Sequence, residues 1–166
     1  LYYWRDIDKA RTALMRAMEI SPNDPDTLTT FAYLQTIAGD TDAALQTIAA
    51  AHEASPLSPE LNADYGWVHY KARNWDDAER LCKTSVRLDP TSVFALSCVI
   101  HVNHSQGDSA EAAEYGLNLM ARRGASQAAI EEIRSIANAE EREAAYWEWT
   151  LNWLGQSSRN DRLSQR

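Results

Sequence analysis

The chain has little of several residue types that mark common classes of protein. Only two cysteines occur in 166 residues, which argues against a small fold held together by disulfides. Basic residues are in deficit, because 16 lysines and arginines stand against 24 aspartates and glutamates, for a net charge of −8. With no long basic run, the chain is a poor candidate for binding a nucleic-acid backbone.

Long hydrophobic runs are absent as well. No window of about 18 consecutive apolar residues occurs, so we expect no transmembrane helix. No charged-then-apolar leader is visible at the start, so no signal peptide is expected. Apolar residues nevertheless make up 45% of the chain, which is enough for a buried core and speaks against overall disorder.

Catalytic motifs are missing too. The six glycines are scattered through the chain and form no phosphate-binding loop, and neither a GxSxG nor an HExxH motif is present. Acidic pairs such as Glu131-Glu132 and Asp76-Asp77 could serve acid–base chemistry, but such pairs are ordinary on exposed helix faces and in first turns. We expect a protein that is not an enzyme and has no cofactor.

What the sequence does contain is a period of 34 residues. The prolines form two ladders with this step: Pro22, Pro56 and Pro90, and Pro25 and Pro59. Two further ladders keep the same step: Ala10, Ala44, Ala78 and Ala112, and Asp6, Asp40, Asn74 and Asp108. Gly39 and Gly107 lie two periods apart, with Arg73 between them. Agreement among separate ladders indicates a tandem-repeat architecture.

Each period is predicted to be a pair of helices. In the unit at 59–92, Ser58 is a suitable N-cap and Pro59 suits the first helical position. Asn74 is expected to cap the second helix, and Pro90 to end it. Apolar residues lie at helical spacing on the two helices: Leu61, Tyr65, Val68 and Ala72, then Ala78, Leu81, Cys82, Val86 and Leu88.

These features resemble the tetratricopeptide repeat (TPR) family, whose pattern places large and small residues at fixed positions of two helices and a proline after the second. The alanine and proline ladders carry the match, and the family's step from a large residue to glycine is found at Tyr65-Gly66. Small residues at these positions let two helices approach closely. The resemblance implies an all-α fold, a right-handed superhelical solenoid of antiparallel helix pairs with about four and a half repeats.

We expect one TPR array over residues 1–155 and a polar tail at 156–166, frayed after Gly155. The expected units are a partial repeat at 1–24, repeats at 25–58, 59–92 and 93–124, and a degenerate capping repeat at 126–155. Terminal units of solenoids are usually atypical. Two helices are expected in the last unit, at 126–138 and 140–154, although Tyr146 stands where the ladder predicts a small alanine.

A narrower resemblance is carried by three segments: YYWRDIDKARTALMRAMEISPND, SPLSPELNADYGWVHYKARNWDDAERLCKTSVRLDP and EREAAYWEWTLNWL. They look like the C-terminal TPR region of bacterial winged-helix transcriptional regulators and adenylate/guanylate cyclases. The resemblance implies a regulatory module of a larger signalling protein. We expect a cytoplasmic location, with the periplasmic region of a membrane-anchored regulator as the alternative.

The first helices of such an array line its concave side. Helical phase then selects a candidate partner-binding groove, with Ala63 on the same phase: Asp26, Thr29, Tyr33, Thr36, Glu60, Asp64, Trp67, Tyr70, Phe94, Ser97, His101 and His104. The groove is aromatic and mildly acidic and contains no lysine or arginine. We therefore expect a neutral to basic protein or peptide segment as the partner.

The groove residues have two other interpretations. Some TPR domains hold a partner's C-terminal carboxylate with basic and asparagine residues, but the matching positions here disfavour it: Thr29, Thr30, Ala63 and Asp64. Tyr33, Trp67 and Phe94 could also pack between adjacent repeats, because the groove phase and the packing phase lie only one residue apart on a helix. The sequence leaves the choice between binding and packing open.

One row of residues has metal-binding chemistry. Cys98, His101 and His104 stand at i, i+3 and i+6 on one predicted helix, and cysteine with two histidines is a zinc-ligand set. The i+6 position has rotated away from i, and no fourth ligand is evident. We therefore expect no metal, with the histidines lining the groove and Cys98 packed as a small apolar residue. Cys82 is expected in the core, and a metal or small-ligand sensor stays as an alternative function.

The two ends of the array carry the remaining expectations. Near the start, one predicted helix has an apolar face whose companion is missing: Ala10, Leu14, Ala17 and Met18. We expect another chain, or Leu1–Trp4 folded back, to cover it, so that a homo-oligomer formed through this unpaired helix is a further alternative function. At the other end, tryptophans are expected to cap the core: Trp147, Trp149 and Trp153.

Overall fold

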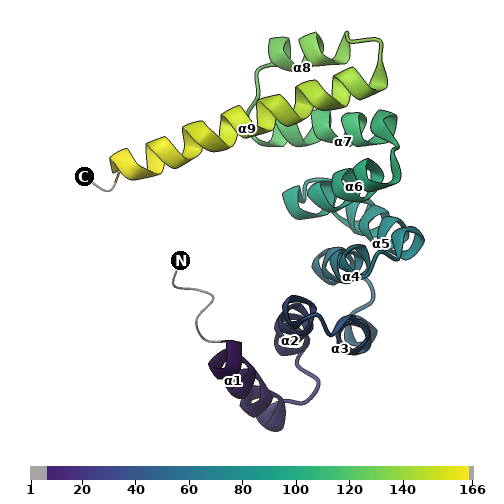
Figure 1. The fold of residues 1–166 in the computed structure, drawn as a ribbon, viewed down its shortest axis with the longest axis vertical. Coiled ribbons are helices and arrows are strands. Elements are labelled where there is room, and N and C mark those ends of the chain that lie inside the picture. The colour runs from purple at the N-terminus through teal and green to yellow at the C-terminus, as the bar shows by residue number, and fades with distance from the viewer. Residues whose placement is uncertain (1–6, 165–166) are drawn as a thin grey trace. The chain divides into compact units, whose positions relative to one another are not determined.

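The computed structural model describes residues 7–164, with side chains from residue 9 to residue 157, and this part of the chain is all-helical, as expected. The helices are α1 (Ile7–Ile20), α2 (Pro25–Ala38), α3 (Thr41–Ala54), α4 (Pro59–Lys71), α5 (Trp75–Leu88), α6 (Val93–Gln106), α7 (Ser109–Arg122), α8 (Gln127–Arg134) and α9 (Ala139–Ser164). Two compact units, Leu1–Cys98 and Val99–Arg166, are described separately (Figure 1). None of the described helices is both long enough and apolar enough to cross a membrane.

The helices begin at the side chains that the ladders place there. Backbone N–H groups donate to N-cap side chains along the chain, for example Thr27 to Asp24 (2.8 Å), Leu61 to Ser58 (3.2 Å) and Glu111 to Asp108 (3.0 Å). These bonds satisfy donors that a helix leaves unpaired in its first turn. Asn74 occupies the N-cap of α5 but makes no capping hydrogen bond, so the predicted cap is wrong in its chemistry. Its amide instead lies 3.5 Å from His69 Nδ1.

The turns within the pairs share one backbone conformation. Gly39, Arg73 and Gly107 have φ angles of 84°, 61° and 81°, in the left-handed region that favours glycine. The period of 68 residues between the two glycines therefore reflects a repeated turn, and Arg73 adopts the same turn despite its side chain.

In the first unit, each pair packs its two helices together, α2 against α3 and α4 against α5, and neighbouring pairs pack through α3 and α4 (Figure 1). The alanine ladder lies at these crossings, because Ala44 and Ala78 are 0% exposed. Gly66 faces α5 so closely that a Cβ atom there would lie 2.5 Å from Cys82 Sγ and 3.3 Å from the Ala78 carbonyl oxygen. The predicted role of small residues is confirmed for this unit.

The same ladder ends differently at α1. Ala10 is exposed, and Leu14, Ala17 and Met18 are half-buried. Met18 packs against the core formed by α2 and its neighbours. The apolar face of α1 is thus covered in part by α2, and the expected cover by Leu1–Trp4 falls outside the described residues.

The second unit replaces the alanine crossing with a different small-to-large pair. Tyr146 of α9 is 2% exposed, and a Cβ atom on Gly116 of α7 would lie 2.7 Å from its ring. Position 146 lacks the alanine that the ladder predicts, but Gly116 on the facing helix still allows the two helices to approach closely.

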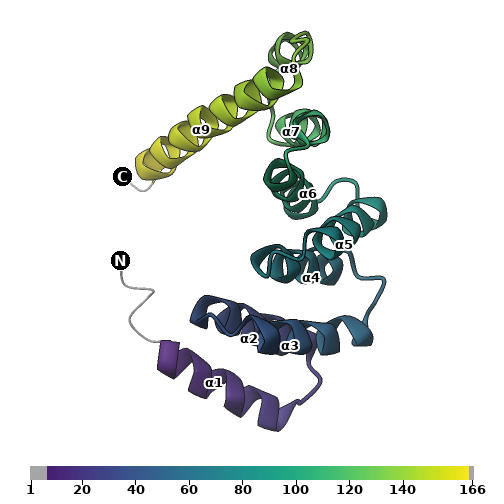
Figure 2. The same ribbon diagram turned by 45° about the vertical axis from the view of Figure 1, so that its right-hand side comes forward.

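The C-terminal helix pair was predicted, but its extent was not. α8 falls within the expected segment 126–138 and α9 covers the expected segment 140–154, yet α9 continues through Gly155 to Ser164. The prediction of a helix end near residue 154 is therefore wrong. Figures 1 and 2 show α9 extending well past α7 and α8. Gly155 is tolerated inside the helix at a cost of about 1 kcal/mol relative to alanine.

The alanine crossing gives a direct test of the fold. Ala78→Trp should lower the free energy of unfolding by about 1–3 kcal/mol or more, because the larger ring must displace the backbone of α4. Ala50→Trp, on the exposed face of α3, is the matched control and should change it by less than about 0.5 kcal/mol. Chemical denaturation followed by circular dichroism measures both, and equal stability of the two variants would contradict the close crossing.

Candidate functional site

An open pocket of about 680 Å³ lies between α2 and α4, the first helices of neighbouring pairs. Four of the expected groove residues line it: Asp26, Thr29, Glu60 and Asp64. The pocket lies at the N-terminal ends of the two helices, beside Pro25 and Ser58. Its described lining carries three carboxylates and no lysine or arginine, so the pocket is acidic.

One hydrogen bond joins the two helices at a residue that lines the pocket, Asp64. The Tyr33 hydroxyl of α2 donates to Asp64 Oδ1 of α4 at 2.6 Å. Burial raises the pKa of Asp64, the bond from Tyr33 acts in the opposite direction, and the charges of Glu60 and Asp26 raise it further. Burial, followed by the bond to Asp64 and its charge, also raises the pKa of Tyr33. A cationic partner in the pocket would therefore stabilise the charged form of Asp64.

Further along α4 lies a group of rings that we call the aromatic cluster: Trp67, Tyr70, Trp75 and Phe94. Trp67 and Tyr70 meet edge-on at 5.3 Å between centroids, Tyr70 and Trp75 at 5.6 Å, and Trp67 and Phe94 at 6.0 Å. Phe94 is 43% exposed, and the other three rings are half-buried. The cluster joins α4 to α6 and still presents aromatic surface. These rings therefore pack between repeats and also remain accessible to a partner.

The remaining groove residues of the first unit are less available to a partner. The hydroxyls of Thr36 and Ser97 donate to carbonyls of their own helices, Ala32 at 2.9 Å and Val93 at 2.8 Å. Thr29 Oγ1 is buried without a hydrogen-bond partner among the described residues. Ala63, expected on the groove phase, is 0% exposed and lies in the interior, so that expectation is wrong.

The two cysteines are bonded to each other. Cys82 and Cys98 form a disulfide with a Cα–Cα distance of 5.6 Å, and both are 0% exposed. Their burial agrees with the expected core positions, but the bond was not predicted. The sulfur of Cys98 is therefore not a free thiolate for a metal, and the described residues contain no cluster of three or more metal-ligating side chains.

His101 and His104 belong to the second unit, where they face Trp147 at 5.3 Å and 5.7 Å between ring centroids. His104 Nδ1 lies 2.7 Å from Glu143 Oε1, and the Trp147 indole donates to the same oxygen at 3.2 Å. Glu143 is only 6% exposed. Its burial raises the carboxyl pKa, but hydrogen bonds from Ser109, Trp147 and His104 outweigh this and lower it. These two histidines anchor α9 within the second unit.

The last two tryptophans form a separate pair on α9. Trp149 and Trp153 lie nearly parallel, 6.4 Å apart between centroids, and the Arg123 guanidinium sits 4.8 Å above the Trp153 ring. Trp147 is on another face, as expected from the helical spacing. Trp153 thus contacts the C-terminal end of α7 through Arg123, and the capping role expected for these rings stays a prediction.

The sequence and fold place this chain among helical repeat proteins. A family model described as the tetratricopeptide repeat matches residues 35–96, the region that holds the pocket's second half, Gly66 and most of the aromatic cluster. This match supports the TPR resemblance for that part of the chain. A comparison with curated proteins finds no match in sequence.

Solved structures extend the likeness to most of the chain. A crystal structure of MamA is 17% identical, covers 93% of this chain and 92% of its own, and superposes with a TM-score of 0.66. PilF of Pseudomonas aeruginosa is 18% identical, covers 86% of this chain and 67% of its own, and gives a TM-score of 0.69. At these identities the likeness shows the fold alone, a helical solenoid of repeated pairs. The superhelical handedness and the repeat boundaries stay predictions.

Asp64 should make stability depend on pH in a predictable direction. Its folded pKa is raised above the ordinary 3.8, so the carboxyl stabilises the fold when protonated and loses that contribution as the pH rises through the folded value. Asp64→Asn removes this ionisation and keeps an acceptor for Tyr33. The variant should gain in melting temperature relative to the parent as the pH rises, with no gain below the ordinary pKa. A difference that is constant with pH would contradict the assignment.

Glu143 should behave in the opposite way. Its pKa is lowered from 4.5, so its contribution is present above that value and lost as the pH falls through the folded pKa. Glu143→Ala leaves the Trp147 indole without its acceptor and should cost about 1–3 kcal/mol at neutral pH. Glu148→Ala, at an exposed position of the same helix, is the control. Denaturation at pH 7 and pH 3 measures both, and an equal loss at the two pH values would rule out the carboxylate's role.

Proposed function

We propose that this chain is a non-catalytic protein–protein interaction module that receives a peptide segment on its first unit. The observation that carries this proposal is the continuity of two recognition elements along α4, the acidic pocket and the aromatic cluster. TPR-type helix pairs provide a preformed surface of this kind, because neighbouring pairs fix the positions of side chains on their first helices. The TPR match over residues 35–96 covers both elements in large part.

The partner is a neutral to basic segment. Asp26, Glu60 and Asp64 line the pocket with no basic residue among its described lining, so a lysine or arginine side chain entering it meets uncompensated negative charge. The net charge of −8 adds to the attraction at a distance and makes association sensitive to salt. An acidic segment is disfavoured for the same reason.

The aromatic cluster supplies the apolar part of the contact. Trp67 lies one turn beyond Asp64 on α4 and is supported by Tyr70 on one side and Phe94 on the other. Aromatic anchors held in place by neighbours usually dominate the binding energy of an interface. A segment with a basic residue followed by an apolar one would engage the pocket and the cluster together.

The context of this module follows from the narrower resemblance. We place it in the regulatory region of a larger bacterial signalling or transcription-regulatory protein, where binding would control a neighbouring effector domain. The location that fits such a regulator is the cytoplasm, with the periplasmic part of a membrane-anchored regulator as the alternative. The zinc-sensor alternative has no support, because Cys98 is in a disulfide.

Self-association is the second candidate function, and one observation favours it. Ala44, Ala78 and Ala112 are 0% exposed, whereas Ala10, on the same ladder, is exposed on α1. A second copy of the chain could cover the exposed face of α1 that carries Ala10. Light scattering at several concentrations decides the point, because a mass that stays at one chain throughout would remove this candidate.

Replacing Trp67 tests the leading proposal. A partner is first recovered by pull-down from the parent organism's extract, and the bound segment is then synthesised and titrated by calorimetry. Trp67→Ala should weaken its binding at least tenfold, about 1.4 kcal/mol, with helix content unchanged. Trp149→Ala, in the second unit, is the matched control and should bind as the parent does. Unchanged affinity for Trp67→Ala would move the binding site away from α4.

The charge of the pocket is tested separately on the same segment. Asp64→Lys should weaken a basic segment and spare an apolar one, whereas Asp76→Lys introduces the same charge change at an exposed position outside the pocket. Equal effects of the two variants would show that net charge, and not the pocket, governs association.

A further inference from the structure

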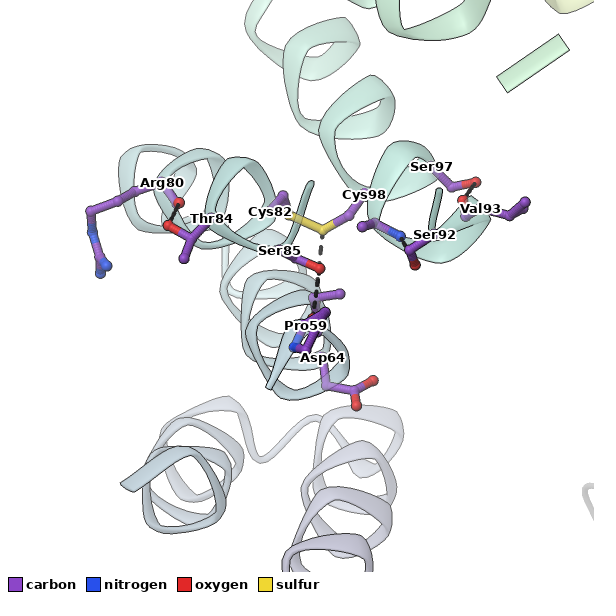
Figure 3. The surroundings of a disulfide bond; sticks show 12 residues. Pro59, Asp64, Arg80, Cys82, Thr84, Ser85, Ser92, Val93, Ser97 and Cys98 are labelled. Carbon is purple, nitrogen blue, oxygen red and sulfur yellow. Dashed lines mark hydrogen bonds between the residues drawn. A yellow bond between two sulfur atoms is a disulfide. The ribbon is translucent and has the colours of Figure 1, made fainter. Parts of the chain in front are cut away.

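The disulfide occupies an unusual place in the first unit. It joins Cys82, in the middle of the second helix of one pair, to Cys98 in the first helix of the next pair (Figure 3). The two cysteines are the only ones in the chain. The bond therefore links α5 covalently to the first half of α6, residues 93–98.

That half of α6 carries one side of the aromatic cluster. Ala95 and Leu96 are 0% exposed and fix the helix in the core, while Phe94 reaches the Trp67 ring at 6.0 Å. On α5, the helix that carries Cys82, the Ser85 hydroxyl donates to the Pro59 carbonyl at 2.6 Å and joins α5 to α4 (Figure 3). The position of Phe94 relative to α4 thus depends on the link between α5 and α6.

The surroundings of the sulfurs suit the reduced state as well as the oxidised one. Cys98 Sγ lies 3.8 Å from the Ala63 carbonyl oxygen, so a thiol at Cys98 has an acceptor within reach of a sulfur hydrogen bond. Cys82 is 0% exposed, and a free cysteine behaves as a small apolar residue in such a core.

We propose that Cys82 and Cys98 form a redox-controlled clasp on the first half of α6. In the oxidised state the clasp holds α6 against α5 and keeps Phe94 on Trp67. In the reduced state residues 93–98 open more readily, and the aromatic cluster loses its fixed partner on α6. A consequence for partner binding rests on the function proposed above, whereas the loosening of α6 does not.

The reductant in this proposal is a dithiol. One of its thiolates attacks a sulfur of the pair, the Cys82–Cys98 bond breaks, and the other cysteine leaves as a thiolate that takes up a proton. The second thiol of the reductant then attacks the mixed disulfide and releases the first cysteine as a thiol. The protein disulfide gains two electrons and two protons and becomes two thiols, while the dithiol is oxidised to its own disulfide.

Burial decides when this exchange takes place. Both cysteines are 0% exposed, so a dithiol reaches them only when α6 lifts from α5. The clasp is thus stable once formed and suits an oxidising compartment, which favours the periplasmic alternative over the cytoplasm for the oxidised form.

The first test counts thiols on the full chain. Protein purified in air with oxidised glutathione should show no free thiol when titrated in denaturant, and two after treatment with dithiothreitol. Two free thiols in the oxidised preparation would overturn the proposal, because the pair would not have closed.

The second test compares the two redox states by hydrogen exchange and thermal unfolding. Reduction should speed amide exchange in residues 93–98 by about tenfold or more, lower the melting temperature by roughly 5–10 °C and leave exchange in α3 unchanged. Circular dichroism checks that the reduced chain is still folded. Equal exchange and equal melting temperature in the two states would overturn the clasp.

A variant without the bond provides the control. Cys82→Ala combined with Cys98→Ala should exchange at residues 93–98 as the reduced parent does, with and without dithiothreitol. A response of this variant to the dithiol would show that the effect does not pass through the pair. A chain that loosens at α6 on reduction but binds no segment would leave the clasp standing and refute the function proposed for the surface.

Discussion

The structure depends on how closely its helices approach one another. Ala44 and Ala78 are fully buried at crossings, and Gly66 leaves no room for even a methyl group beside Cys82. Interiors packed at this density feel the addition of a single methylene. In the first unit neighbouring pairs pack through α3 and α4, so a shift at one crossing also moves the side chains that the first helices present.

The candidate site follows from that packing. Tyr33 reaches Asp64 from the preceding pair, and Phe94 reaches Trp67 from the following one, so both recognition elements are assembled from residues of adjacent repeats. No single pair contains either element. The site therefore exists only when neighbouring pairs are in register, and its geometry is as rigid as the helix crossings beneath it.

The sequence predicted what is periodic and missed what occurs once. The proline, alanine and glycine ladders located the helix pairs and turns, because each repeat solves the same steric problem with the same residue. The disulfide was missed, since nothing in one sequence says that Cys82 and Cys98 face each other across a repeat junction. The close crossing at Tyr146 could not be predicted, because its partner Gly116 lies on another helix at no fixed spacing. The length of α9 was also missed, because the sequence after residue 154 contains few apolar residues whose spacing would show as periodicity.

The contact between Gly116 and Tyr146 restricts which repeats of this chain can be duplicated or deleted. Internal pairs present alanine at equivalent crossings, so a gain or loss of one 34-residue unit in the first unit would join compatible surfaces. The contact of α7 with α9 instead fits a ring into a glycine notch, and neither α3 nor α5 carries a glycine at the position equivalent to Gly116. Duplication and deletion are therefore open to the early repeats, while α7 and α9 must be inherited together as a matched terminus.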